Sequence, residues 1–363
     1  MGTVASDILK KNGEECYLIA LEGNKKAVID GMASFESGGV GDLVVLPNKE
    51  AFEKLNGRTF AAVVIPKELE KEAGNFPKDT AVFVSTAVEL SHALLKQKLF
   101  THDYSKVGWK KIHSSAVIHE SVKIPTSTSI GPGVVIERGA VIGKNSRIMS
   151  NAVIEHNAII GSDVLIHPGV IIGWECEIGD ECTILSNTVI GGDGFGFSQD
   201  QHFNHHRIPQ TGNVIIGKKV TVGAVNTIDR GTYGSTIVGD GCIMGSLCHI
   251  GHNVTLGVNC IMTGGFLCGG SCTLGDRVVA SGGAMLKDHL NICSDVYLLH
   301  RAGVVQDITK PGVYAGSPVL PMPNYVKSNA IYAQLDEMRQ KLRELTGQKS
   351  LSGDGTGSAE SKH

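Results

Sequence analysis

The sequence lacks the features of a membrane, secreted or nucleic-acid-binding protein. No stretch approaches the roughly 18 consecutive apolar residues of a transmembrane helix, and no basic segment followed by an apolar run opens the chain. The formal net charge is only -3, which gives no field strong enough to attract nucleic acid. We therefore expect a cytoplasmic protein with no transmembrane segment and no nucleic-acid partner.

The sequence also lacks the CxxC spacing that is typical of a zinc site. Nine cysteines are present without a secretory signal, so reduced thiols are expected. Six of them are separated by multiples of six residues: Cys176, Cys182, Cys242, Cys248, Cys260 and Cys272. This spacing predicts a structural role in a repeat and no metal binding.

A six-residue repeat is the strongest signal in the chain. Isoleucine recurs at every sixth position from residue 112 to residue 190, fourteen times in one register. The register breaks at 191–213, resumes at 216–228, breaks again at 229–237 and then continues to residue 304. Glycine, of which there are 46 residues, often follows the repeated apolar residue.

The repeat predicts a mainly β fold, a left-handed parallel β-helix of hexapeptide repeats. Each short strand points one large apolar side chain inward, and the next coil stacks on it at ~4.8 Å. If three hexads form one triangular coil, there are roughly ten coils. The glycines are expected to relieve the corners, and the six cysteines, together with several alanines, lie two residues before the large apolar positions as core filler.

The remaining segments predict three further parts. Residues 1–105 alternate apolar runs with helix-like segments and indicate a small α/β domain, whereas 106–322 form the β-helix domain. Residues 323–347 are predicted to be a C-terminal helix with a heptad seam that favours packing between subunits: Ile331, Leu335, Met338, Leu342 and Leu345. The Gly/Ser-rich tail, 348–363, is predicted to be disordered.

The two breaks in the repeat are candidate sites of function. A prism with a filled core has no internal pocket, so a site is expected outside it, in a cleft between neighbouring prisms. The first break contains GGDGFGF at 191–197, whose glycines would let the backbone approach a ligand. It also contains three histidines, His202, His205 and His206, which we interpret as part of a solvated loop because their spacing matches no common metal site.

His252 is the best candidate for a general base. It lies in CHIGHNVTLG, between regular hexads, two residues beyond the inward-pointing Ile250, and His249 is close to it in sequence. His289 follows 37 residues later, which is two 18-residue coils plus one residue. Both histidines are therefore expected near one edge of the prism.

The chain resembles the UDP-3-O-acylglucosamine N-acyltransferases of lipid A biosynthesis over nearly its full length. The motifs are GGDGFGF at 191–197, IPQTGNVIIGKKVTVGAVNTIDRG at 208–231, IGHN at 250–253, HLNIC at 289–293 and ITKPGVY at 308–314. The resemblance implies a homotrimer that transfers a hydroxyacyl or acyl chain from acyl carrier protein to the 2-amino group of a UDP-3-acylated glucosamine. It implies no metal and no soluble cofactor.

The resemblance also implies roles for individual residues. His252 matches the family's catalytic histidine, His289 its second active-site histidine, and the backbone N–H of Gly270 its oxyanion donor. Asn48 matches a uridine contact. Five residues are thus expected to contact substrate: Asn48, Phe52, His249, Phe195 and Phe197.

The chain departs from the family at three positions near the expected base and at one in the N-terminal domain. Gly245, Ser246 and His249 stand where the family usually has Asp, Asn and Gln, and His249 is a candidate substitute for the Asp. Val45 stands where an aromatic ring usually stacks on uracil, and Phe52 is a candidate replacement for it.

These departures leave alternatives open. The chain is an enzyme with an altered acyl chain or acceptor, or a paralogue with lost or changed chemistry that binds a sugar nucleotide or an acyl carrier. A third class, an O-acyltransferase on another sugar, usually lacks the N-terminal domain. Retention of His252, His289 and Gly270 together favours the enzyme.

Overall fold

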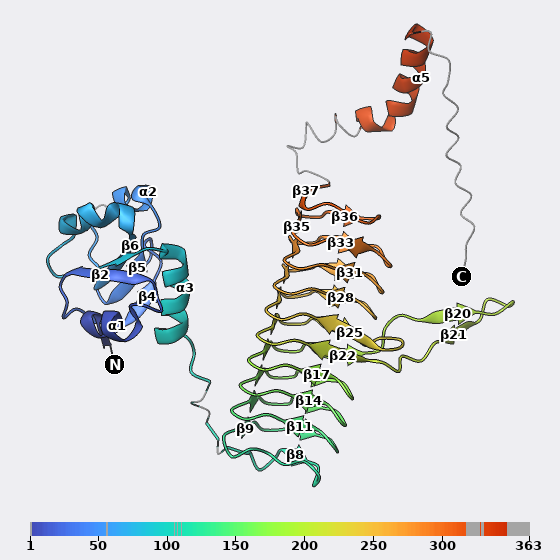
Figure 1. Ribbon diagram of the computed structural model, residues 1–363, viewed down its shortest axis with the longest axis horizontal. Coiled ribbons are helices and arrows are strands. Elements are labelled where there is room, and N and C mark those ends of the chain that lie inside the picture. The colour runs from blue at the N-terminus through green and yellow to red at the C-terminus, as the bar shows by residue number, and fades with distance from the viewer. Residues whose placement is uncertain are drawn as a thin grey trace. The chain divides into compact units, whose positions relative to one another are not determined.

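The chain forms two compact units, Met1–Val107 and Gly108–His363. The computed structural model (Figure 1) describes residues 2–55, 57–104, 106, 108–109, 111–316, 327 and 330–346. The predicted disordered tail and the first residues of the predicted C-terminal helix lie outside the described residues. No helix in the described ranges is long and apolar enough to cross a membrane.

The first unit is a mixed sheet between two layers of helices. The sheet has the order β2-β7-β6-β5-β4, with β2 antiparallel to β7 and the other pairs parallel: β2 (Leu18–Gly23), β4 (Gly31–Ala33), β5 (Asp42–Val45), β6 (Ala62–Pro66) and β7 (Ala81–Ser85). Two short strands, β1 (Thr3–Val4) and β3 (Val28–Ile29), pair beside it. The helices are α1 (Ala5–Asn12), α2 (Lys49–Glu53), the 3-10 helix η1 (Lys67–Asn75) and α3 (Val88–Leu99).

Each face of this sheet buries its own apolar cluster, which explains the continuous apolar runs of the central strands. One cluster joins the sheet to α1 and α3 through Ile8 and Leu95, both fully buried. The other joins it to α2 and η1 through Ala51 and Leu69. The α/β architecture expected for this region is confirmed.

The second unit is a three-sided parallel β-helix made of three sheets, of ten, eight and ten strands. The first sheet contains β8 (Val117–Ile118), β10 (Val135–Ile136), β13 (Val153–Ile154), β16 (Ile171–Ile172), β19 (Val189–Gly192), β24 (Thr227–Asp229), β27 (His249–Ile250), β30 (Leu267–Cys268), β33 (Met285–Leu286) and β36 (Gly303–Val304). The second contains β11 (Val141–Ile142), β14 (Ile159–Ile160), β17 (Glu177–Ile178), β22 (Asn213–Ile216), β25 (Ser235–Val238), β28 (Thr255–Leu256), β31 (Thr273–Leu274) and β34 (Asn291–Ile292). The third contains β9 (Ser129–Ile130), β12 (Arg147–Ile148), β15 (Leu165–Ile166), β18 (Thr183–Ile184), β23 (Thr221–Val222), β26 (Ile243–Met244), β29 (Ile261–Met262), β32 (Val279–Ala280), β35 (Val296–Leu298) and β37 (Gly312–Tyr314).

Sheets of this size correspond to about ten coils, as the hexads predict. The left-handed β-helix expected from the repeat is confirmed. The first hexad is irregular, because Ile112 forms only an isolated bridge with Ile130 and is 44% exposed. Regular strands therefore begin at β8.

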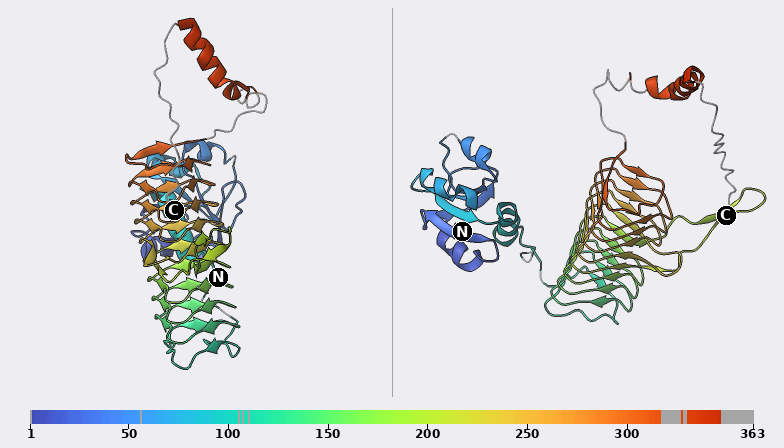
Figure 2. Two further views of the ribbon diagram at one scale, coloured as in Figure 1. Left: turned by 90° about the vertical axis from the view of Figure 1, so that its right-hand side faces the viewer. Right: turned by 45° about the horizontal axis from the view of Figure 1, so that its top comes forward.

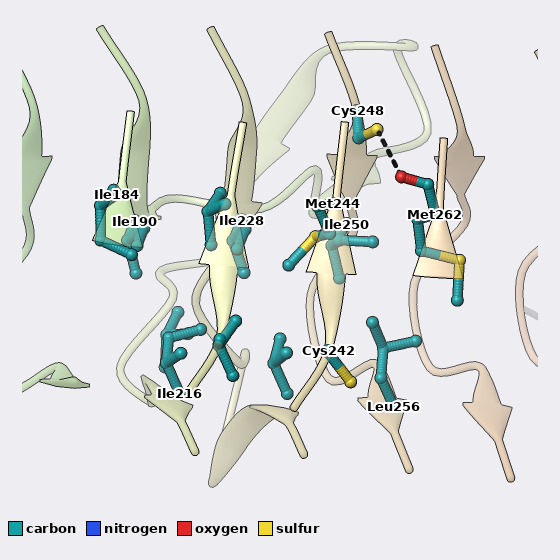
Figure 3. Close-up of a cluster of buried hydrophobic side chains, with 14 of the residues drawn as sticks. Ile184, Ile190, Ile216, Ile228, Cys242, Met244, Cys248, Ile250, Leu256 and Met262 are labelled. Atoms are coloured by element: carbon teal, nitrogen blue, oxygen red, sulfur yellow. Dashed lines mark hydrogen bonds between the residues drawn. The ribbon is translucent and has the colours of Figure 1, made fainter. Parts of the chain in front are cut away.

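Columns of large apolar side chains fill the prism, with smaller residues between them. Figure 3 shows Ile190, Ile228 and Ile250 in line on successive coils of one sheet, with Cys242 and Cys248 among the buried side chains. All six cysteines with hexad spacing are free thiols that are at most 2% exposed. Cys242 Sγ donates to the Gly257 carbonyl oxygen at 3.0 Å, so its polar atom is satisfied without a metal. The core-filler interpretation is confirmed.

Glycine relieves some of the corners, as at Gly133 (φ 68°), Gly139 (φ 71°) and Gly241 (φ 69°), but most glycines directly after the repeated apolar residues do not. The left-handed backbone conformation occurs two residues later and is often filled by Asn, as at Asn151 (φ 59°), Asn157 (φ 58°) and Asn259 (φ 56°). The preceding glycine is required by stacking instead. A Cβ on Gly143 would lie 2.3 Å from the carbonyl carbon of Gly161 in the next coil, so only glycine fits there.

The first break in the repeat is a β-hairpin that projects from the side of the prism (Figure 2). It contains β20 (Phe197–Gln199) and β21 (His205–Arg207), which pair antiparallel. The second break is a short connection between β24 and β25. The helix α5 (Leu335–Thr346) carries the predicted seam, and its apolar residues are exposed: Leu335, Met338, Leu342 and Leu345.

Candidate functional site

The three residues expected to be catalytic lie on successive coils at one edge of the prism. Ile250 pairs with Cys268, and Cys268 with Leu286, which aligns the turns after β27, β30 and β33. The Ser271 N–H donates to the His252 carbonyl oxygen at 2.8 Å, and the His289 N–H to that of Gly270 at 2.9 Å. The structure therefore brings His252, Gly270 and His289 together, and we call this trio the histidine edge.

The hydrogen bonds around His252 decide which ring nitrogen is free. Nδ1 lies 3.4 Å from Thr232 Oγ1 and 3.2 Å from Asn253 Oδ1. The Thr232 hydroxyl donates its own proton to Gln210 Oε1 at 2.8 Å, and Asn253 Oδ1 accepts from the Thr232 N–H at 2.9 Å. Both neighbours of Nδ1 therefore present oxygen lone pairs, which favours a proton on Nδ1 and leaves the Nε2 lone pair free.

Gly270 lies against the face of the His252 ring. A Cβ added to Gly270 would be 2.6 Å from Nε2, 2.8 Å from Cε1 and 2.9 Å from Cδ2, so glycine leaves the space that the imidazole occupies. The Gly270 N–H has no acceptor among the residues that the structure describes. The edge thus combines a free base with an unpaired backbone donor on the adjacent coil.

His289 occupies a corner position with left-handed backbone, at φ 59°. Its side chain is 70% exposed, and Nδ1 lies 2.9 Å from Asp288 Oδ2. The hydrogen bond from His289 lowers the pKa of Asp288. This pair is therefore exposed to solvent beside the histidine edge.

The glycine-rich part of the first break packs against His252. A Cβ on Gly194 would lie 2.7 Å from His252 Cβ, so this backbone approaches the imidazole as closely as it can. The next residue, Phe195, is 83% exposed, and its ring lies 5.2 Å from that of Phe197. At the hairpin tip, His206 Nε2 is 3.0 Å from Asp200 Oδ2, and no group of three or more potential metal ligands occurs in the described part of the chain.

Arg230 anchors both ends of this break and was missed in the sequence. It is fully buried, and its guanidinium donates to the carbonyl oxygens of Gly191 (2.8 Å), Gly212 (2.9 Å) and Trp174 (3.1 Å). Its Cζ also lies 3.6 Å from the centroid of the Trp174 ring. A charged residue at the start of the second break was the available signal, but burial cannot be read from spacing.

His249 and Asp229 form a second polar pair beside the edge. His249 Nδ1 is 2.7 Å from Thr227 Oγ1, and its Nε2 is 3.7 Å from Asp229 Oδ2. Burial lowers the pKa of His249, which favours a neutral ring. Burial raises the pKa of Asp229 to about 6, with Asp193 adding to the rise and His252 opposing it.

The two candidates in the first unit have local structural roles. Asn48 caps α2, with Oδ1 accepting from the Ala51 N–H at 2.9 Å. The Phe52 ring is half-buried and packs edge-on against Phe76, with centroids 5.3 Å apart. Neither lines the pocket of this unit that contains Val45, the position where an aromatic ring was expected. That pocket is also lined by residues that the motifs did not indicate, among them Phe35, His92 and Lys96.

Comparison with known proteins assigns the family. The chain is 43% identical over 345 residues to a UDP-3-O-acylglucosamine N-acyltransferase from Methylococcus capsulatus, and the match covers 95% of this chain and 97% of the relative. The chain belongs to the UDP-3-O-acylglucosamine N-acyltransferases. The expected acyltransferase activity is therefore confirmed.

Two further kinds of similarity concern the β-helix. A family model described as GMPPB C-terminal domain matches residues 107–195. Among solved structures, a UDP-N-acetylglucosamine acyltransferase from Campylobacter jejuni is 25% identical at a TM-score of 0.41, covering 66% of this chain and 86% of that one. An Arabidopsis UDP-N-acetylglucosamine acyltransferase is 21% identical at a TM-score of 0.42, with the same coverage of both chains.

One departure of this N-acyltransferase from its family has a steric reason. A Cβ on Gly245 would lie 2.6 Å from the Gly264 nitrogen, so the usual Asp does not fit there without a shift of the coil. Ser246 Oγ accepts from the Ala224 N–H at 3.2 Å. Both residues follow β26, in a different sheet from the strand that precedes His252.

Gly270→Ala tests the close packing of this backbone against the His252 ring. The added methyl would displace the ring, so we expect kcat to fall about 10-fold or more, since this is the order of effect of a misplaced catalytic group. The free energy of unfolding should change little, because the atoms that the methyl meets are the far end of the His252 side chain. Steady-state kinetics and a thermal melt check this, with Gly303→Ala as control, since a Cβ there meets nothing within 4 Å. An equal loss in both variants would contradict the prediction.

Proposed function

We propose that this N-acyltransferase moves a 3-hydroxyacyl or acyl chain from acyl carrier protein to the 2-amino group of a UDP-3-acylated glucosamine in lipid A biosynthesis. The observation that carries the proposal is the juxtaposition of the His252 imidazole, whose Nε2 lone pair is free, with Gly270 of the adjacent coil, whose N–H has no acceptor among the described residues. Acyl transfer to an amine needs a base and an oxyanion donor on either side of one carbon. The histidine edge supplies both.

In the proposed mechanism the amine attacks the thioester carbonyl carbon while His252 Nε2 accepts a proton from it. The Gly270 N–H donates to the oxyanion of the tetrahedral intermediate. Collapse forms the amide and breaks the C–S bond, and the proton on His252 neutralises the leaving thiolate of the carrier. His289 and His249 contact the substrate beside the edge, with Phe195 and Phe197 against its apolar part. No cofactor takes part.

Asn48 and Phe52 are proposed contacts to the uridine. Asn48 uses Oδ1 for its cap, which leaves its amide N–H groups for a uracil or ribose oxygen. Phe52 is half-buried, so only an exposed edge or face of its ring can meet the base.

The proposed assembly is a homotrimer. The core of the prism is filled, so the site is open on the surface and gains walls only from a neighbouring prism. Outward-facing apolar residues lie on the prism faces, among them Val141, Ile243 and Met285. The exposed seam of α5 gives a second surface for self-association.

The test is acyl transfer by the purified protein. We expect turnover with 3-hydroxyacyl carrier proteins of some chain length and UDP-3-acylglucosamine acceptors with an ester or amide at position 3, measured by mass spectrometry of the product, and a trimer in light scattering. A folded trimer that is inert on every pair would favour the catalytically altered paralogue. Transfer to a hydroxyl in place of the amine would favour the O-acyltransferase.

A further inference from the structure

Asp229 breaks a pattern of carboxylates along this edge of the prism. In lower coils the residue after the inward-pointing isoleucine is Glu137 or Glu155, and each carboxylate accepts from a backbone N–H in the next coil at 2.9 Å. Asp229 holds the same register position after Ile228. Its shorter side chain accepts no hydrogen bond from the residues that the structure describes, although it is only 14% exposed.

The Asp229 carboxylate lies beside the histidine edge, with several charged groups around it. Ile228 pairs with Ile250, so Asp229 lies one coil below the turn that holds His252. His249 Nε2 of the same sheet is 3.7 Å away, while the break contributes Asp193, which is paired with Arg207 and lies 3.9 Å from Arg230 Nε. Arg207 and Arg230 are thus the cations nearest to Asp193, whereas among the described residues the basic group within 4 Å of the Asp229 carboxylate is the His249 imidazole, with His252 in the turn of the next coil.

We propose that Asp229, which lies in the 208–231 motif, is a positioning residue that electrostatically stabilises the imidazolium of His252 in this chain, where Gly245 stands in place of the usual Asp. This inference rests on the proposed role of His252 as the base. When Nε2 takes the proton of the amine, the ring becomes a cation, and a nearby carboxylate lowers the energy of that state more than that of the neutral ring. His249, which is bonded to Thr227, supports the carboxylate and does not replace it.

The ionisation of Asp229 gives the proposal a pH signature. Its pKa is raised by burial to about 6, so the carboxylate is charged at pH 8 and largely neutral at pH 5. The benefit of Asp229 to catalysis is therefore full at pH 8 and is lost as the pH falls through about 6. Its cost to stability sets in as the pH rises above the unfolded pKa of about 3.9 and is complete above the folded pKa of about 6, because the unfolded chain ionises more readily.

Asp229→Asn is the decisive variant. We expect kcat at pH 8 to fall about 10- to 50-fold with both KM values within about 2-fold, and the ratio of wild-type to variant kcat to shrink below pH 6. The variant should melt at or above the wild-type temperature at pH 8, an effect that a merely structural residue would not show. Glu155→Gln, at the same register position three coils lower, is the control and should keep wild-type kcat.

Two outcomes would overturn the proposal. One is wild-type kcat at every pH in Asp229→Asn. The other is a large rise in the acceptor KM with no change in the pH dependence, which would assign the carboxylate to the substrate amine. The double variant with His252→Ala separates this inference from the proposed function: loss of Asp229 should add nothing in that background. If His252→Ala alone is fully active, the proposed role of His252 as the base fails. This result is distinguishable from a failure of the Asp229 proposal, in which His252→Ala is inactive but Asp229→Asn is not impaired.

Discussion

We expect His252→Ala to lower kcat by about 10²- to 10⁴-fold, the usual contribution of a positioned general base. The ring supplies a free lone pair on Nε2 beside Gly270, since its Nδ1 faces the oxygens of Thr232 and Asn253. Removing it leaves the amine without a proton acceptor but keeps the oxyanion donor, so residual activity should remain. Single-turnover assays with saturating acyl carrier protein measure the loss in the chemical step.

A matched control for this variant exists on the same edge. His156 occupies the same register position in a lower coil, where its ring stacks parallel to that of Trp174 with centroids 5.9 Å apart. His156→Ala removes an imidazole of the same kind but should leave kcat within about 2-fold of wild type. A His252→Ala enzyme that also keeps wild-type kcat while folded would refute the base assignment.

The fold was predictable because its physics is periodic. A strand with one inward side chain every six residues can stack only in one register, so Ile130, Ile148 and Ile166 determine the position of every strand between them. The histidine edge followed from the same arithmetic, since the 18-residue coil places Gly270 directly above His252. The coil spacing therefore predicted that His252 and Gly270 lie next to each other.

The period could not reveal which position bends the chain. Two positions of each hexad repeat with the same spacing. One is the glycine directly after the inward apolar side chain, and the other is the residue with positive φ two positions later. Sequence alone therefore does not show which of the two forms the turn. The structure does: Gly143 is demanded by close stacking, whereas Asn157 supplies the left-handed backbone. Asn tolerates this conformation at low cost, which is why glycine is not required there.

The residues that surround His252 could not be predicted from the sequence, for a different reason. Thr232, Gln210 and Asp229 belong to the breaks, where the period is absent and no spacing says which residues meet. Gln210 and Thr232 are 22 positions apart but share a hydrogen bond of 2.8 Å. Only the closure of the loop onto the next coil brings them to His252, and that closure depends on Arg230.

Arg230→Met should be the most destabilising single change at this site. It removes the donor to three carbonyl oxygens, the buried one of Gly191 and the part-buried ones of Gly212 and Trp174, and the cation over the indole ring. A buried acceptor left without a donor costs about 1–3 kcal/mol, and with the two further hydrogen bonds and the cation–π contact we expect a loss of about 3 kcal/mol or more in the free energy of unfolding. Activity should fall as well, since the loop that carries Gly194 to His252 loses the anchor at both of its ends.

Arg207→Met separates this anchor from an ordinary surface charge. Arg207 also pairs with Asp193 in the same loop, but its side chain is 59% exposed, and an exposed pair contributes about 1 kcal/mol or less. Urea unfolding followed by circular dichroism, with kcat measured on the same samples, should therefore show a large loss for Arg230→Met and a small one for Arg207→Met. The Arg230 guanidinium contacts both ends of the break and the coil beneath it, whereas the Arg207 guanidinium contacts Asp193 within the loop. Equal losses in the two variants would therefore mean that contacts within the hairpin, and not Arg230, hold the loop.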